Sequence, residues 1–223
     1  DAYPIIDWQD RLMTGNGFTH NHTLSMSAGS ERIRVMTSLG YLDQNGIIKN
    51  ANFKRYNLRN NMDIRMNDRL NFRLDIAATY SRRAANPYQS SVFGFMNSKD
   101  PLMLAQWSDG SYAPFTGGTV NPLPMIEQGV GGNNIRQNGT LKASAALEYK
   151  PVQWLTLEVK AAPQFTAVKT HKFVDLVEYH SDPYGTVSKT SNAEYNSLDE
   201  TVTATHKVGG QAVLGRQGSL TTP

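Results

Sequence analysis

The chain lacks cysteine, long apolar runs and a strong net charge. Because none of its 223 residues is a cysteine, it has neither a disulfide framework nor a thiolate metal site. No stretch approaches the roughly 20 apolar residues of a membrane-spanning helix, so a β-barrel is the only form in which this chain would cross a bilayer. The formal net charge of +3 is small for the length and argues against a nucleic-acid partner.

Two long segments between Phe53 and Ser81 alternate almost residue by residue between apolar and polar side chains. A period of two places each set on one face of a strand. At about 12 to 14 residues, each segment exceeds the usual globular strand and the roughly 9–11 residues of a strand crossing a bilayer. One face carries Tyr56, Leu58, Met62, Ile64, Leu70, Phe72, Leu74, Ile76 and Tyr80, interrupted by Asn60. The other carries Arg55, Asn57, Arg59, Asn61, Asp63, Arg65, Arg73 and Asp75.

The same alternation recurs elsewhere and is separated by connections of two kinds. It covers 33–41, 140–149 and 155–161, and more weakly 197–207 and 212–216. We expect short turns near 28–32, 67–69, 150–153 and 208–211, and longer connections near 43–52, 82–136 and 168–192. Short turns on one side and long loops on the other are typical of outer-membrane barrels. The sequence therefore predicts an all-β fold of about eight antiparallel strands, arranged as transmembrane β-barrel hairpins.

Aromatic residues lie near both ends of the predicted strands. Tyr41, Tyr56 and Tyr80 precede or follow the long loops, and Tyr149 and Trp154 flank a short turn. Two such sets are expected at the two interfaces of a membrane barrel, although strand ends in soluble proteins also often carry tyrosine.

The cost of burying charge in lipid decides which face of the predicted strands contacts lipid and which lines a lumen. An arginine at the midplane of a barrel's outer surface costs about 2–4 kcal/mol. We therefore expect the arginine-rich face to line a wet lumen and the apolar face to contact outer-membrane lipid. Within the lumen, opposite charges pair across strands, and the candidates are Arg59, Asp63, Arg73 and Asp75. The position of Asn60 on the apolar face is not explained by this arrangement.

Four blocks of sequence, in this order and at this spacing, carry a family resemblance. They are Asp7–Asp10, His20–Glu31, Ser38–Lys49 and Phe53–Asn61. Together they resemble the SusC/RagA family of TonB-dependent outer-membrane transporters of Bacteroidetes-type bacteria. In that family the second block enters a tight periplasmic turn, usually with two glycines, where this chain has Ala28-Gly29. The resemblance is looser beyond Arg82 but continues to about Gly215.

The resemblance implies a 22-stranded barrel in a Gram-negative outer membrane, filled by an N-terminal plug. It also implies import of oligosaccharides or peptides, a SusD-like surface lipoprotein as partner, and energy from the TonB complex. Residues 1–223 would then be a partial barrel domain with extracellular loops at about 82–136 and 168–192. The plug, the signal peptide and the remaining strands would lie outside it. We accordingly expect a truncated chain that cannot transport by itself.

The long loop near 82–136 contains a helix signal and three aromatic residues. Ser90–Ser98 has the pattern of a short helix capped by Ser90 or Ser91, which either contacts a ligand or partner or packs the loop. Trp107, Tyr112 and Phe115 lie among small polar residues. Aromatic faces stack on sugar rings as on other flat apolar surfaces, but a loop of this length also needs apolar anchors, and we favour the anchor interpretation.

No motif predicts catalysis, a metal site or a cofactor. His20 and His22 share a strand face, but no third ligand is evident nearby. Gly129–Asn134 lacks the Lys-Ser/Thr of a phosphate loop, and Asn45-Gly46 is better interpreted as a turn. No nucleophile, base and acid can be assembled with plausible geometry, so an enzyme is not expected.

Two alternatives to an importer segment remain open from the sequence. One is a small complete outer-membrane barrel with an adhesive or structural role. The other is a soluble carbohydrate-binding β-sandwich, which also has one apolar and one polar face on each sheet. The sandwich predicts that Leu58, Ile64, Leu74 and Ile76 are enclosed in a core, whereas the barrel predicts that they are not.

Overall fold

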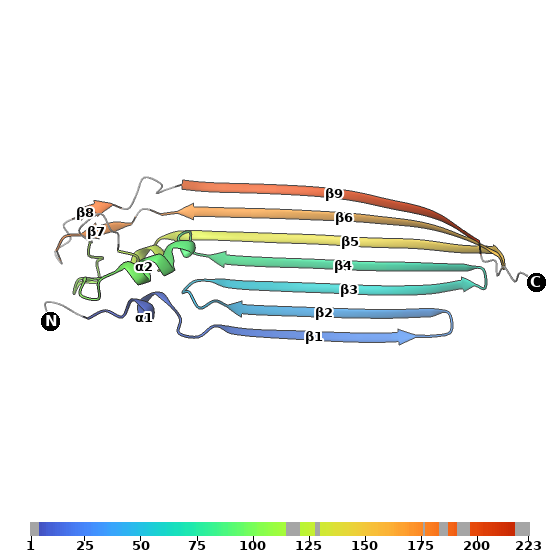
Figure 1. Cartoon of the computed structure of the whole chain (residues 1–223), viewed down its shortest axis with the longest axis horizontal. Helices are drawn as coiled ribbons and strands as arrows, with labels where there is room; N and C mark the ends of the chain where they lie inside the picture. The colour runs from blue at the N-terminus through green and yellow to red at the C-terminus, as the bar shows by residue number, and fades with distance from the viewer. Residues whose placement is uncertain are drawn as a thin grey trace, which may run out of the picture.

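Seven long strands lie side by side in one antiparallel sheet, in the order β1-β2-β3-β4-β5-β6-β9 (Figure 1). The computed structural model describes residues 5–114, 121–127, 130–175, 177–182, 187–190 and 197–216. The strands are β1 Phe18–Gly29, β2 Ile33–Asn45, β3 Asn52–Asn67, β4 Leu70–Ala85, β5 Gly132–Val152, β6 Leu155–Val174 and β9 Ser197–Arg216. The all-β antiparallel prediction is confirmed, with seven strands in the large sheet where about eight were expected.

The connections alternate between short turns at one end of the sheet and long loops at the other. Figure 1 shows the turns on the right and the long connections on the left. The predicted turns after Gly29, Asn67 and Val152 are confirmed. Two of them are closed by local side-chain bonds of the kind that favours turns. Ser30 Oγ accepts from the Ile33 amide at 3.2 Å, and Asn67 Oδ1 accepts from the Arg69 amide at 2.9 Å.

The predicted turn at 208–211 is wrong, because β9 is one continuous strand. Val208 pairs with Pro163, and Gly209 and Gly210 pair with Ala162 and Ala161 along β6. The two glycines suggested a turn, but their backbone is extended here, and β6 supplies twenty residues of partner strand to hold them. The two weak segments at 197–207 and 212–216 are therefore halves of one strand.

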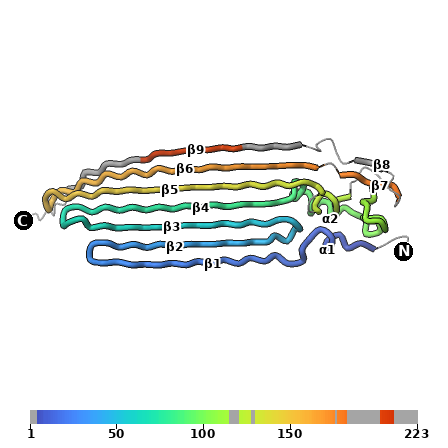
Figure 2. Tube along the Cα trace, turned by 180° about the vertical axis from the view of Figure 1, so that it is seen from behind, coloured from blue at the N-terminus to red at the C-terminus, as the bar shows by residue number. Residues whose placement is uncertain are grey.

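The turns are staggered across the sheet. The first hairpin ends level with Asp63 and Ile64 of β3, which runs on to Asn67, and β5 runs on past Tyr149, the partner of Leu70, to Val152. Stagger of this kind accompanies the strand tilt needed to close a sheet into a barrel. In the described residues, β1 and β9 each pair on one side only, and they form the two edges of the sheet (Figure 2).

The sheet is a single layer without a core of its own. Leu58 is 38% exposed, and Ile64, Leu74 and Ile76 are also only partly covered. Within the described ranges no second sheet covers them, so the β-sandwich alternative does not fit. A contiguous exposed apolar face marks a surface made for lipid or for another protein.

The buried core instead lies beyond the long-loop end of the sheet, in a group of segments that we call the cap. Its helices are α1 Trp8–Leu12, the 3-10 helix η1 Gln89–Ser91, α2 Val92–Ser98 and α3 Leu123–Ile126, and its small sheet pairs β7 Glu178–His180 with β8 Val187–Thr190. The core cluster of the cap contains Ile6, Trp8, Leu12, Ile48, Val92, Ala105, Leu123 and Ile126. Segments from four parts of the chain thus share one apolar core.

The cap includes the predicted helix in the loop after β4. The expected helix at 90–98 is confirmed as η1 and α2, but Ser91 at its N-cap makes no side-chain capping bond. Val92 is fully buried in the core cluster, which supports the packing interpretation of this helix. No helix in the described part of the chain is long and apolar enough to span a membrane.

One buried asparagine holds the loops of the cap together. The side chain of Asn121 donates to the carbonyl oxygens of Ala105 (2.6 Å) and Ala113 (3.0 Å) and accepts from the Leu123 amide (3.1 Å). Its own carbonyl accepts the Tyr179 hydroxyl at 3.1 Å. Buried polar backbone groups need hydrogen-bond partners. The side-chain amide of Asn121 supplies them to loop backbone groups that are not paired within a sheet.

Candidate functional site: two faces and a cap

The apolar face is organised in rows of residues that lie directly opposite one another across successive strands. One of them, the leucine row, consists of Leu24, Leu39, Leu58, Ala78, Leu141 and Phe165. Its large members are exposed, from 38% at Leu58 to 64% at Leu24. Because side chains alternate, every second residue toward either end of each strand lies on this same face.

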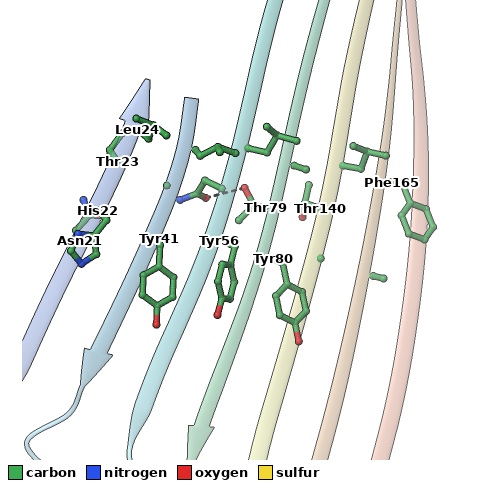
Figure 3. Close-up of a pocket in the computed structure, with 18 residues that line it drawn as sticks. Asn21, His22, Thr23, Leu24, Tyr41, Tyr56, Thr79, Tyr80, Thr140 and Phe165 are labelled. Atoms are coloured by element: carbon green, nitrogen blue, oxygen red, sulfur yellow. Dashed lines mark hydrogen bonds between the residues drawn. The ribbon is translucent and has the colours of Figure 1, made fainter. Parts of the chain in front are cut away.

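The next row toward the cap, the tyrosine row, carries aromatic rings on four strands. It consists of His22, Tyr41, Tyr56, Tyr80, Gly139 and Ala167. The centroids of Tyr41 and Tyr56 are 5.1 Å apart and those of Tyr56 and Tyr80 are 6.3 Å apart. Figure 3 shows the three tyrosines side by side on one face of the sheet. The tyrosines therefore mark one level across the sheet.

The apolar character ends abruptly one row closer to the cap. This charged row consists of His20, Asp43, Lys54, Arg82, Gln137 and Lys169. Asp43 Oδ2 accepts the Tyr41 hydroxyl at 2.8 Å and the Lys54 ammonium at 3.0 Å. A row of charges directly above a row of tyrosines is the order expected at a membrane–water interface. The sequence already contained this signal, since a charged residue lies two positions from each tyrosine on the cap side: Asp43 after Tyr41, Lys54 before Tyr56 and Arg82 after Tyr80.

Asn60 is accounted for by a partner on the neighbouring strand. Its Nδ2 donates to Thr37 Oγ1 at 2.7 Å, and the two residues lie directly opposite each other on β3 and β2. Hydrogen bonding removes much of the cost of a polar group in an apolar surrounding. The polar interruption of the apolar face is therefore a hydrogen-bonded pair of residues rather than a single unpaired amide.

The eight residues predicted to face a lumen share the opposite face of β3 and β4. Asn61 lies opposite Asp75 and Asp63 opposite Arg73, and the others alternate with them along the same strands. They are Arg55, Asn57, Arg59, Asn61, Asp63, Arg65, Arg73 and Asp75. On this face Thr79 donates to Asn57 Oδ1 at 3.3 Å. Their assignment to a lumen stays a prediction.

The expected ion pairs among these residues do not form in the described part of the chain. Arg73 pairs instead with Glu158 of β6, at 2.9 Å between Nη2 and Oε2. The residue opposite Arg73 on β5 is Ala146, a small buried residue. Because the alanine side chain is short, the arginine reaches over β5 to a carboxylate two strands away. The periodicity of β3 and β4 could not predict this partner, because Glu158 lies on another strand.

Two of the three predicted loop aromatics are integrated in the cap. The Trp107 indole N–H donates to the His180 carbonyl at 2.7 Å, and the Tyr112 hydroxyl donates to Glu127 at 2.5 Å. Tyr112 also packs against the core cluster, and burial together with the Glu127 carboxylate raises the pKa of its hydroxyl. Phe115 lies outside the described residues. Both described aromatics thus hold loop segments together, and sugar stacking by them stays a prediction.

Sequence comparison finds relatives among TonB-dependent receptors. TonB-dependent receptor P26 of Formosa agariphila is 28% identical over 176 residues, which are 77% of this chain and 17% of that receptor. TonB-dependent receptor SusC of Bacteroides thetaiotaomicron is 38% identical over 50 residues, 22% of this chain. No family model matches the chain. The chain therefore spans about a sixth of the length of receptor P26, the curated relative that matches most of this chain.

Structure comparison adds the fold. The RagAB peptide importer in its closed-closed state superposes with a TM-score of 0.55 at 17% identity, covering 97% of this chain and 28% of that one. A second structure of the RagAB peptide transporter gives a TM-score of 0.56 at 14% identity. The chain is similar to a barrel segment of SusC/RagA-type TonB-dependent receptors. This confirms the predicted resemblance, and the relatives named are receptors and importers.

Proposed function

We propose that this chain is part of the barrel wall of a TonB-dependent outer-membrane importer. In this proposal the leucine and tyrosine rows contact lipid, the arginine-rich face lines the lumen, and the cap lies on the extracellular side. The small turns then face the periplasm. The similarity to TonB-dependent receptors and to the RagAB importer supports the function, and the arrangement of rows supports the orientation.

The height of the apolar band carries the proposal. On β4, Tyr80 of the tyrosine row and Leu70 at the turn end lie ten residues apart, a distance of roughly 33 Å along an extended strand. A barrel strand tilted by 35–45° converts this to about 25 Å of height, which is the thickness of the apolar band of outer-membrane barrels. Tyr149, the partner of Leu70, and Trp154 provide the aromatic residues of the second interface.

The relatives support a proposal for the substrate class and the partner. The RagAB structures are of a peptide importer, which supports a peptide as cargo. We propose an oligosaccharide or a peptide as cargo and a SusD-like lipoprotein as the extracellular partner, as the resemblance to the SusC/RagA family implies. The cap is the element of this chain that such a partner would meet, because it occupies the long-loop end. Energy would come from the TonB complex through segments outside this chain.

Site-directed labelling of the intact receptor tests the orientation. This segment has no cysteine of its own, so in a receptor with any other cysteines replaced, single substitutions at neighbouring positions of β4 give an unambiguous signal. Leu74→Cys is expected to react with membrane-soluble maleimides only, and Asp75→Cys with water-soluble ones. Equal reaction of both positions with the water-soluble reagent would show that the apolar face does not contact lipid.

Uptake measurements separately test the role of the cap in import. Cells whose receptor lacks the cap segment 86–131 are expected to lose uptake of the cargo while the barrel still reaches the outer membrane. Full uptake by such cells would exclude a role of this cap in transport.

A further inference from the structure

The charged row contains three neighbouring donor side chains without a described acidic partner. Arg82, Gln137 and Lys169 lie on adjacent strands β4, β5 and β6 in direct register. The ion pairs of the described side chains use Asp43 for Lys54 and leave Arg82 and Lys169 without a carboxylate within pairing distance. Arg82 also lies directly opposite Lys54. Like charges placed opposite each other destabilise a sheet, so this position favours an added anion.

Below these three donors, the tyrosine row is interrupted. Where β2, β3 and β4 carry tyrosine, β5 carries Gly139 and β6 carries Ala167. A methyl group built on Gly139 would meet nothing closer than the Ala167 carbonyl oxygen at 3.9 Å, so the glycine leaves open space. Gly139 and Ala167 therefore form the floor of a notch in the aromatic row.

The sides of the notch are apolar. Tyr80 bounds it on one side, and Phe165 of the leucine row lies on the side away from the cap (Figure 3). Leu141, the partner of Phe165 on β5, lies in the same row. These three residues are 42–48% exposed and belong to an open apolar hollow of about 1090 Å³ that also includes Gly139 and Ala167. Cationic donors thus stand at the cap end of the notch, and hydrocarbon surface continues from it toward the middle of the band.

We propose that this notch binds one phosphorylated lipid of the outer leaflet, with its phosphate on Arg82, Gln137 and Lys169 and an acyl chain over Gly139 and Ala167. Arginine and lysine bind phosphate oxygens with charge-assisted hydrogen bonds, and the interface is the depth at which a lipid carries its phosphate. The inference rests on the proposed function only in that the apolar face must contact the bilayer.

The hollow on the cap side of Arg82 does not suit the same ligand. It has a volume of about 740 Å³ and is lined by Glu127 and Asp175 as well as Arg82. Two carboxylates would repel a phosphate. The phosphate is therefore placed on the bilayer side of Arg82, between the charged row and the notch.

Lipid binding by the intact receptor in detergent, followed by native mass spectrometry, tests the proposal. The probes are dioleoylphosphatidic acid, dioleoylglycerol with the same acyl chains but no phosphate, and inorganic phosphate without acyl chains. We expect the receptor to retain phosphatidic acid in preference to both other probes. Equal retention of dioleoylglycerol would exclude a phosphate site, and binding of inorganic phosphate as tight as that of phosphatidic acid would exclude a lipid site.

Variants assign the effect to the notch. Near a membrane surface each cation contributes about fivefold to the binding of an anionic lipid, so Arg82→Gln and Lys169→Gln are each expected to weaken phosphatidic acid about fivefold. Gly139→Leu fills the notch and should weaken phosphatidic acid without changing the binding of dioleoylglycerol elsewhere. Lys142→Gln removes the same charge from the opposite face and should have no effect. Unchanged retention by the Arg82→Gln/Lys169→Gln double variant would overturn the proposal.

Two further measurements separate the possible failures. Heat-modifiable gel mobility establishes that each variant still forms a folded barrel, and Gly139→Cys reports the environment of the notch. If the cysteine reacts only with membrane-soluble reagents but retention is independent of phosphate, the lipid site is wrong and the barrel orientation stands. If the cysteine reacts with water-soluble reagents as fast as Asp75→Cys, the orientation itself is wrong.

Discussion

Asn60 and Thr37 form a hydrogen-bonded pair, 2.7 Å between Nδ2 and Oγ1, on the face of the sheet that is otherwise apolar. They lie directly opposite each other on β3 and β2, and Ile76 is the next residue of the same row on β4. In the proposed orientation, an amide at this depth has no water to bond with. The threonine is therefore the partner that makes Asn60 tolerable.

Removing the threonine hydroxyl is expected to destabilise the barrel more than removing both polar groups. Thr37→Val leaves the Asn60 amide without its partner, at a cost of about 1–3 kcal/mol. The double variant Thr37→Val/Asn60→Leu should recover most of the loss, because two apolar side chains then replace the pair. Urea unfolding of the intact receptor in lipid vesicles measures both. A double variant less stable than Thr37→Val would contradict the proposed pairing.

Adding one arginine to each face of β5 tests which face meets lipid. Ala143 belongs to the row of Asn60 and Ile76, near the middle of the apolar band, and Ser144 lies opposite Asp75 on the other face. Ala143→Arg is expected to cost about 2–4 kcal/mol of folding stability, whereas Ser144→Arg gains a nearby carboxylate and should cost much less. The same vesicle unfolding assay compares them. Equal losses of folding stability would mean that the two faces do not differ in their contact with lipid and water.

The Arg73–Glu158 ion pair should contribute little to folding stability by itself. The small size of Ala146, which lies on β5 between the two strands of the pair, should contribute more. The Arg73 side chain is 49% exposed, and exposed ion pairs typically contribute about 0.2–1 kcal/mol. A double-mutant cycle with Arg73→Gln and Glu158→Gln should give a coupling energy in that range. Ala146→Leu should cost more, about 1–3 kcal/mol, because it overfills a buried position and blocks the path of the arginine. A coupling energy that survives Ala146→Leu would show that the arginine takes another path.

Asn121 is expected to control the order of the cap without affecting the sheet. Asn121→Ala removes three hydrogen bonds to Ala105, Ala113 and Leu123, and each buried group left unpaired costs about 1–3 kcal/mol. Hydrogen exchange should accelerate in segment 100–127 and remain unchanged in β3 and β4. Asn97→Ala, at an exposed position of α2, is the matched control and should leave exchange unchanged. Uniform acceleration across the strands would contradict a local role.

Trp107 separates anchoring from ligand contact. Trp107→Phe keeps an aromatic face but loses the indole N–H that donates to the His180 carbonyl. If the residue only anchors the cap, Trp107→Phe and Trp107→Ala should both increase proteolysis of the loop and leave cargo affinity unchanged. If it stacks on cargo, Trp107→Phe should retain affinity and Trp107→Ala should lose it. Isothermal titration of the intact receptor with its cargo distinguishes the two.

Local periodicity made much of this protein predictable. Leu58 and Arg59 are neighbours with opposite character, and in a strand neighbours must face opposite sides, so the two faces followed directly from the order of residues. The tight turn at Asn67–Arg69 was equally local. By contrast, Gly209 and Gly210 favoured a turn that did not form, because a twenty-residue partner strand outweighed their intrinsic preference.

By itself, the sequence determined the two faces of β3 and β4 and three of the turns, because each depends on residues close together in the chain. Only the tertiary structure decided which residues meet across strands or loops: Asn60 with Thr37, Arg73 with Glu158, Asn121 with Ala105, Ala113 and Tyr179, and Arg82 with Gln137 and Lys169 next to a gap at Gly139. Contacts of this kind depend on register and on the size of intervening residues such as Ala146. Neither is encoded in the period of a single strand.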